Sequence, residues 1–226
     1  MESSALKPVK PNILLGISSH TPAITDEDEK LLDARFSAMP QKKCELCGAS
    51  ISDEFRHKLH LEKAWFNACG MCFYPANLDL IPSSNPRNII YFPTLNQAML
   101  NSVLRAIWAM NNLWALEPEN QVLTEMCEST GQIEEFINSA KMITKSYFQC
   151  DDAAIVAATM GLLTPDMYRQ RYKLFGSFRW LPDRSIFETE MAFWTKNDYN
   201  GLHPENMSGN ITQFMTKYTP GFNLKE

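Results

Sequence analysis

The sequence lacks any long hydrophobic run. Its longest apolar stretch covers only the four or five residues around Asn12–Ile17, whereas a membrane-spanning helix needs about 20. Lys7 and Lys10 near the N-terminus are not followed by the apolar segment of a secretory signal peptide. We therefore expect a cytosolic protein.

Recognisable enzyme motifs are also missing. There is no glycine-rich phosphate loop, no nucleophile elbow and no HExxH motif. The chain has four histidines, and two of them, His20 and His203, are remote from the other two. Because histidine is the most common general base, this composition offers little for acid–base catalysis. We predict that the protein is not an enzyme.

An excess of positive charge is absent as well. The formal net charge is −5 and the sequence pI is about 5.5, which disfavours nucleic acid as a partner, because nucleic-acid binding usually requires a basic face. The 226 residues are 45% hydrophobic and 21% charged, as in ordinary globular proteins. This length suits one domain, or one domain with appendages.

The sequence does contain two Cys-x-x-Cys pairs. Cys44 and Cys47 form the first pair, and Cys69 and Cys72 follow about twenty residues later, which is the spacing of a four-thiolate zinc site. The neighbouring glycines, Gly48 and Gly70, suit metal-binding turns because glycine tolerates positive φ angles. Four thiolates leave zinc no open position, so we predict one structural Zn²⁺ that does no chemistry.

Other interpretations of these cysteines are weaker. Two disulfides require an oxidising compartment, which disagrees with the expected cytosolic location. A thioredoxin-type redox pair requires a βαβ context that the surrounding sequence does not show. Buried free cysteines are common and inert, but chance packing does not explain four cysteines in two matched pairs.

Two histidines, His57 and His60, lie between the cysteine pairs. One hypothesis makes either of them a general base beside a second, open metal site. The other makes them structural, hydrogen-bonded to the backbone or substituting as a zinc ligand. We favour the structural interpretation, since four cysteines already saturate the ion. The spacing places both histidines on one face of a helix, but on opposite faces of a strand.

The chain divides into an N-terminal arm, residues 1–40, and one domain, residues 41–226. The arm is predicted to hold a short strand at Ile13–Ile17 and one short helix, capped by Thr25 and carrying an acidic first turn at Asp26–Glu29. We expect a zinc module at 41–93, including a strand at Ile89–Phe92, then a helical part at 94–200. The tail, residues 201–226, lacks a strong pattern.

The clearest predicted helix begins with a capping box of Thr94 and Gln97. Its apolar stripe indicates the buried axis of the domain and consists of Leu100, Val103, Leu104, Ile107, Met110 and Trp114. Further helices are predicted at Gln121–Cys127, Ile133–Phe148, Ala153–Met160 (capped by Asp151 or Asp152), Asp166–Phe175 and Ile186–Asn197.

The C-terminal half also contains two unpaired cysteines, an apolar helix side and several arginines. Cys127 and Cys150 are interpreted as packed apolar residues rather than ligands. Phe136, Ile137, Ala140, Ile143 and Tyr147 are expected on one side of their helix. The arginines are interpreted as a solvated face or as contacts to an acidic partner: Arg169, Arg171, Arg179 and Arg184.

Several stretches together resemble the DotN (IcmJ) family of subunits of the Dot/Icm type IVB secretion system. They are KCELCG, ACGMCF, NLDLIPS and IIYFPTLNQAMLNSVLRAIW, followed by DDAAIVAATMGLL, FRWLPD and MAFWT. The resemblance covers most of the chain from about Cys44 onward. It implies an α+β fold with a zinc-stapled treble-clef or HNH-like module, a small β-hairpin and a mostly helical C-terminal half.

The resemblance also implies a function. Members of this family are structural adaptor subunits that bind the C-terminal extension of the coupling ATPase DotL, in a complex with DotM, IcmS, IcmW and LvgA that recruits effectors for export. We therefore expect a cytoplasmic protein, peripheral to the bacterial inner membrane through its complex. The resemblance assigns no partner-binding residue.

Likeness to HNH folds supplies an alternative function, a metal-dependent endonuclease. His57 or His60 would then be the general base, and Asn67 the accompanying asparagine. The residue after Cys72, however, is Phe73, where such enzymes carry a second metal ligand. We therefore favour an adaptor over an endonuclease.

Overall fold

The computed structural model describes residues 11–82 and 88–199. The predicted tail at 201–226, His203, Lys7 and Lys10 lie outside the described residues. The helices are α1 (Asp26–Ala38), α2 (Gly70–Ala76), α3 (Gln97–Leu116), α4 (Gln121–Phe148), α5 (Ala153–Gly161), α6 (Pro165–Arg169), α7 (Tyr172–Phe175) and α8 (Glu188–Asp198). Short 3₁₀ helices are η1 (Ser18–His20), η2 (Leu78–Leu80) and η3 (Arg184–Phe187). The strands are β1 (His57–Leu61), β2 (Ala64–Ala68), β3 (Asn88–Tyr91) and β4 (Phe178–Leu181).

The strands form two antiparallel pairs, which confirms a mixed helix-and-strand fold with a small hairpin. β1 and β2 make the hairpin between the cysteine pairs, with His57 opposite Ala68. β3 pairs with β4, with Ile89 opposite Trp180, so the zinc module and the helical part share a sheet. The strand predicted near Ile89–Phe92 is present as β3, but the strand predicted at Ile13–Ile17 is wrong. That segment is held instead by Gly16, whose N–H donates to Pro75 and whose carbonyl accepts from Leu78.

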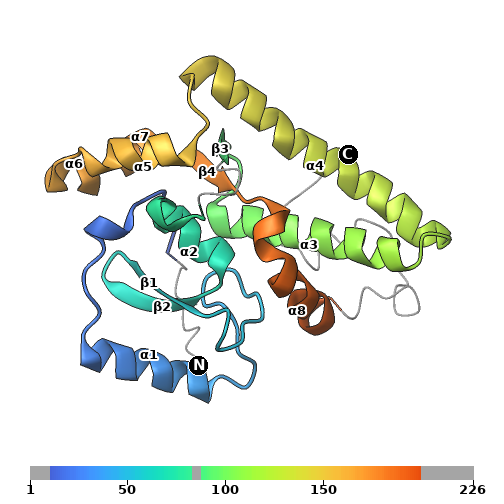
Figure 1. Cartoon of the computed structure of the whole chain (residues 1–226), viewed down its shortest axis with the longest axis horizontal. Helices are drawn as coiled ribbons and strands as arrows, with labels where there is room; N and C mark the ends of the chain where they lie inside the picture. Colours follow the sequence, from blue (N-terminus) through green and yellow to red (C-terminus); the bar gives the residue numbers. More distant parts are fainter. Residues whose placement is uncertain (1–10, 83–87, 200–226) are drawn as a thin grey trace, which may run out of the picture.

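The helix of the N-terminal arm forms as predicted. The Thr25 side chain caps α1 by accepting from the Asp28 N–H, and all four residues of the first turn are acidic. Leu32 and Phe36 are buried, whereas Leu31 points to solvent. α1 therefore covers the β1–β2 hairpin with one narrow apolar side (Figure 1).

α3 is the central helix, in contact with α2, α4 and α8 (Figure 1). Its predicted stripe is buried except for Trp114. The predicted Thr94 capping box is wrong, because Asn96 caps the helix through the Met99 N–H. Gln97 is buried, and its amide pairs with the backbone N–H and carbonyl of Trp180 on β4. The Gln97 side chain, which the local pattern placed in the helix cap, therefore binds the distant strand β4 instead.

α4 is one continuous helix of 28 residues where two were predicted. It passes through Gly131 and carries β3 against its C-terminal half, where the Tyr91 N–H donates to Thr144 Oγ1 at 2.6 Å. Ile137 and Ala140 are buried, but Phe136, Ile143 and Tyr147 are exposed, so the apolar side predicted for this helix is only partly buried. Among the described helices, none combines the length and the apolar character that crossing a bilayer requires.

The remaining helices follow the predicted order with shifted bounds. Asp152 caps α5 through the Ala154 N–H, and the predicted helix Asp166–Phe175 is broken into α6 and α7. Of the four arginines proposed to meet a partner together, Arg179 is buried and donates to the Leu95 carbonyl.

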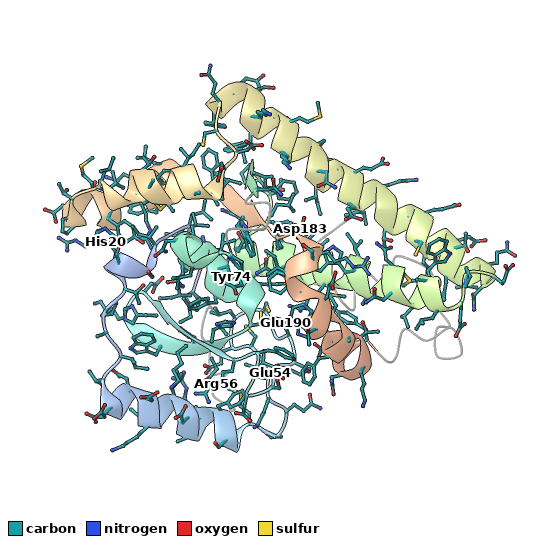
Figure 2. All side chains as sticks on the ribbon, viewed as in Figure 1. His20, Glu54, Arg56, Tyr74, Asp183 and Glu190 are labelled. Atoms are coloured by element: carbon teal, nitrogen blue, oxygen red, sulfur yellow. The ribbon has the colours of Figure 1, made fainter. Side chains whose placement is uncertain are left out.

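Tyr74 of α2 lies near the middle of the molecule, with its ring 5.8 Å from that of Trp180 (Figure 2).

Candidate metal centre

The first cysteine pair lies in a tight turn. The Cys44 N–H donates to the Ala49 carbonyl, and the Gly48 N–H donates back to the Cys44 carbonyl. Gly48 has φ +78°, as the sequence predicted, since a side chain is strained in this region. Lys43 and Ser50 pair across the base of the turn. The turn therefore presents Cys44 and Cys47 toward the same point.

The second pair lies at the start of α2. Cys69 is the N-cap and Cys72 is in the first turn, with its N–H donating to the Cys69 carbonyl at 3.0 Å. Gly70 does not need a positive φ, contrary to the sequence prediction. Its requirement is steric, because a Cβ there would lie 3.0 Å from the ring of Phe187. The β1–β2 hairpin brings this helix start onto the turn of Cys44 and Cys47.

The predicted four cysteines come together. Their sulfurs all lie within 4.8 Å of one another, and the Cys47 and Cys69 sulfurs are 3.6 Å apart. That separation is too long for a disulfide, and all four thiols are free. A tetrahedral ion with metal–sulfur bonds of about 2.3 Å holds its ligands about 3.8 Å apart. The cluster can therefore hold one soft metal ion.

The environment acts in opposite directions on the pKa values of Cys47 and Cys72. Hydrogen bonds with Cys44, and then with Cys69 and Cys72, hold the pKa of Cys47 well below its usual value, while burial acts in the opposite direction. Burial, together with the neighbouring thiols, raises the pKa of Cys72 well above its usual value. These opposite directions make the Cys47 thiol more acidic than the Cys72 thiol. A bound cation would displace the remaining protons, which couples metal affinity to pH.

Two polar residues of α3 complete the surroundings. Arg105 is only 4% exposed, and its Nη1 donates to Cys47 Sγ at 2.9 Å. Asn101, one turn earlier, donates to Cys72 Sγ at 3.5 Å and to the Met71 carbonyl at 2.7 Å. Burial is the largest single influence and lowers the pKa of Arg105, but the negative charges of Cys47, Tyr199 and Cys69 together outweigh it and raise that pKa. The cluster is therefore partly neutralised by a cation from outside the zinc module.

Sequence reasoning missed Asn101 and Arg105. The available signal was their spacing: two polar side chains four residues apart within an otherwise apolar stripe. Buried polar groups require partners, and here the partners are the sulfurs.

α8 closes the site from the C-terminal side. The Trp194 indole N–H donates to the Ser50 carbonyl at 2.9 Å, and Asp198 accepts from the Ser50 N–H at 2.8 Å. Arg105 also lies 5.5 Å from the Trp194 ring. The turn that bears Cys44 and Cys47 is therefore held by both α3 and α8.

His57 and His60 lie on a strand and so point to opposite faces, as expected for that geometry. His57 stacks on Phe73 with ring centroids 4.5 Å apart, and burial lowers its pKa. His60 contacts Trp65, and burial lowers its pKa too, opposed by the charge of Asp28. Neither histidine belongs to the cysteine cluster. Within the described chain, neither makes the hydrogen bond to backbone that the structural interpretation allowed.

Asn67, the third residue of the endonuclease hypothesis, is structural. Its side-chain oxygen accepts from Arg56 Nε at 2.8 Å, and its amide donates to the Leu32 carbonyl at 3.3 Å. It pairs with Lys58 across the hairpin and therefore lies on the face opposite His57. The two side chains do not converge on one site.

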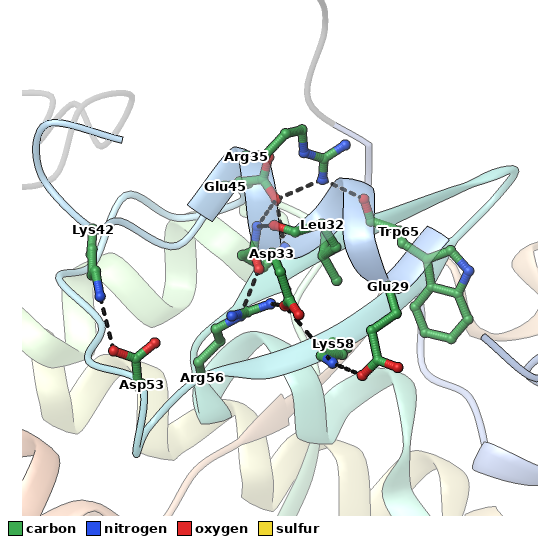
Figure 3. A network of polar contacts seen from close by, with 11 residues as sticks. Glu29, Leu32, Asp33, Arg35, Lys42, Glu45, Asp53, Arg56, Lys58 and Trp65 are labelled. Carbon is green, nitrogen blue, oxygen red and sulfur yellow. Dashed lines mark hydrogen bonds and ion pairs between the residues drawn. The ribbon is translucent and has the colours of Figure 1, made fainter. Parts of the chain in front are cut away.

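An ion-pair network joins this second face to α1 (Figure 3). Arg56 pairs with Asp33, and Lys58 pairs with Glu29. Arg35 donates to Glu45, which follows the first cysteine, and to the Trp65 carbonyl at 2.7 Å. The side-chain hydrogen bond and charge of Arg56 lower the pKa of Asp33. The basic residues on this face are thus occupied by α1.

Across the described residues, no second group of three or more histidine, cysteine or acidic side chains lies close enough to share an ion. The cysteine cluster is therefore the candidate metal centre of the described chain. The sequence matches no model of a known protein family, and it matches no curated protein.

Proposed function

We propose that the cysteine cluster holds one structural Zn²⁺ ion and that the protein is an adaptor subunit without catalytic activity of its own. The observation that carries this proposal is the closure of the site. Four sulfurs fill a tetrahedral shell, three of the cysteines are buried, and Arg105 and Asn101 occupy the surroundings. Such a centre holds segments together and leaves no ligand position for substrate.

The arrangement around the ion supports a treble-clef module. A cysteine-bearing turn, a β-hairpin and a helix that begins at the second cysteine pair follow one another in that order. This order is the one that the resemblance to the DotN (IcmJ) family implies, and the helices after residue 94 agree with it. We propose membership of that family on these grounds.

The adaptor role is supported by exposed apolar side chains on α4. Met142 and Tyr147 are 74% and 80% exposed, and Phe136 lies on the same helix. Exposed apolar residues of this size often mark interaction surfaces. Following the resemblance, we propose that the partner is the C-terminal extension of the coupling ATPase DotL. The complex would include DotM, IcmS, IcmW and LvgA at the cytoplasmic face of the inner membrane.

An endonuclease is less well supported. Phe73 occupies the ring face of His57 where a second metal ligand would be needed, and Asn67 is engaged on the other face of the hairpin. The net charge of −5 also opposes binding to a polyanion.

The two functions separate in one experiment. Purified full-length protein is mixed with a DotL C-terminal segment and analysed by size-exclusion chromatography, and in parallel with supercoiled plasmid and Mg²⁺ or Mn²⁺. We expect a stable complex and intact plasmid, both unchanged in a His57→Ala, His60→Ala double variant. Failure to form the complex would refute the adaptor proposal, and plasmid cleavage that disappears in the double variant would establish the endonuclease.

A further inference from the structure

A cavity of about 500 Å³ lies at the end of the molecule that holds η1 and α6, and the four cysteines are not among its lining residues. Figure 2 shows His20 at this end, close to α6 and α7. Four segments form its walls: the N-terminal segment, the tip of the β1–β2 hairpin, the end of α2 at Ala76 and the α6–α7 region. Its lining includes Leu14, His20, Leu61, Glu62, Arg171 and Tyr172.

The walls are held in place by close packing. The Ile17 N–H donates to the Tyr168 hydroxyl at 2.9 Å, across 151 residues of sequence. A Cβ at Gly16 would lie 2.7 Å from that hydroxyl oxygen and 2.8 Å from the Ala76 carbonyl oxygen. The N-terminal segment is therefore clamped between the end of α2 and α6. A cavity assembled in this way is preformed, as ligand sites usually are.

Arg171 is a cation without a carboxylate partner in the part of the chain that the structure describes. Its Nε donates to the Leu15 carbonyl at 2.9 Å and its Nη1 to the Tyr168 carbonyl at 3.2 Å. The guanidinium also lies 4.2 Å from the centre of the Tyr168 ring, and His20 stacks on that same ring at 3.9 Å. These contacts orient the arginine and leave its second terminal nitrogen unpaired within the described residues.

The other lining residues with ionisable side chains are Arg169, His20, His60 and Glu62. Arg169 is exposed and pairs with Asp166. Glu62 lies at the hairpin tip with φ +55°, a conformation that is costly for a residue other than glycine and is often found at functional sites. No ion pair holds its carboxylate among the described residues. Because Arg169 is paired with Asp166, Arg171 is the lining arginine without a carboxylate partner among the described residues, and Glu62 is the lining carboxylate.

We propose that this cavity binds a small organic oxyanion, with the Arg171 guanidinium on the anionic group and the uncharged part of the ligand against Leu61 and Tyr172. An oriented guanidinium suits carboxylates and phosphates because its N–H groups match two oxygens at once. The volume falls within the range of about 300–1,000 Å³ that is usual for small-ligand pockets. This site is independent of the adaptor function.

Isothermal titration calorimetry on the full-length, metal-loaded protein tests the proposal. Phenyl phosphate and phenylacetate are titrated separately at constant ionic strength, which distinguishes a phosphate site from a carboxylate site, and benzyl alcohol is the uncharged control. We expect one of the two anions to bind saturably and the alcohol not to bind. Arg171→Gln should weaken binding about tenfold or more, because it removes a charge-assisted pair. Lys173→Gln, on the same segment but outside the lining, should change it by less than about twofold.

Arg171 also supports the Leu15 carbonyl, so Arg171→Gln can disturb folding. Glu62→Gln is therefore the second variant, since Glu62 is exposed at the hairpin tip. It should tighten anion binding about threefold or more by removing a like charge. The absence of saturable binding of either anion up to about 10 mM, the weak end of measurable affinity, overturns the proposal. So does equal weakening in the Lys173 variant, or a Glu62 variant that binds no more tightly than the parent protein.

Discussion

Arg105 donates from α3 to the sulfur of Cys47 across 2.9 Å, and it does so while almost completely buried. A divalent ion bound by four thiolates carries two net negative charges, so a buried arginine partly neutralises the complex. Because Arg105 is on α3 and Cys47 is in the zinc module, this contact joins the two parts of the molecule. Metal binding at this cluster would therefore be coupled to docking of the helices.

Replacing Arg105 by methionine should weaken metal binding and destabilise the fold. We expect the affinity for zinc to fall by about tenfold to a hundredfold, as for other residues that contact metal ligands. The free energy of unfolding should fall by about 3 kcal/mol, because one partner of a buried charge pair is removed. Competition with a chromophoric chelator and urea denaturation measure the two effects. Arg35→Met, at an exposed ion pair, is the control and should change the metal affinity little; an Arg105 variant with unchanged affinity would contradict the coupling.

Replacing Cys69 by serine should remove the metal and unfold the zinc module. Cys69 is both a cluster member and the N-cap of α2, and the binding free energy of such sites is largely folding free energy, on the order of 10 kcal/mol. Elemental analysis should find about one zinc per parent chain and little in the variant, with loss of helical circular dichroism. Cys127→Ser is the matched control, since Cys127 is outside the cluster and contacts Asn111. A Cys69 variant that stays folded without metal would refute the structural role.

Stability should depend on pH through His57. Burial against Phe73 lowers its pKa in the folded state, while the unfolded chain keeps a value of about 6.5. As the pH falls below the unfolded value, the unfolded chain binds a proton that the folded chain does not, so stability is lost until the folded pKa is reached. The His57→Phe variant preserves the aromatic contact. Between pH 7 and pH 5.5, a window set by the unfolded pKa of about 6.5, this variant should lose less stability than the parent protein. Urea midpoints measured at several pH values and saturating zinc test this. If the midpoint changes with pH by the same amount in both proteins, His57 is not the group responsible.

Two glycine-to-alanine substitutions should have opposite effects. At Gly16 the new Cβ would meet backbone at 2.8 Å and the Tyr168 hydroxyl at 2.7 Å, so we expect a loss of about 2 kcal/mol in the free energy of unfolding. At Gly131, inside α4, a Cβ has nothing within 4 Å, and alanine should stabilise by about 0.5–1 kcal/mol. Thermal or urea denaturation distinguishes the signs. Destabilisation at Gly131 similar to that at Gly16 would mean that α4 is not the continuous helix described.

Features governed by neighbours in the sequence were predicted well. The cysteine spacing indicated the cluster because a Cys-x-x-Cys turn brings both sulfurs together within a few residues. The Thr25 cap and the helix after it follow from side-chain hydrogen bonds within one turn. The cap of α5 was predicted as Asp151 or Asp152, and the structure shows Asp152, which again bonds a backbone N–H within one turn.

Features that depend on distant partners were not predicted. β4 became a strand because it pairs with β3, and Gln97 left the predicted capping box because the Trp180 backbone in β4 needed its amide. Arg105 and Asn101 looked like isolated polar residues in an apolar stripe until the cysteines were brought against them.

The meeting of the four thiols at one point follows from the sequence, since it depends on two local turns and the hairpin between them. The groups that surround that point, and the cavity lined by His20 and Arg171, exist only because folding brings distant segments together. Arg105 and Trp194, and at the other end Arg171 and Glu62, are separated along the chain, and a buried cation or an unpaired guanidinium acquires meaning only from the groups that folding places beside it.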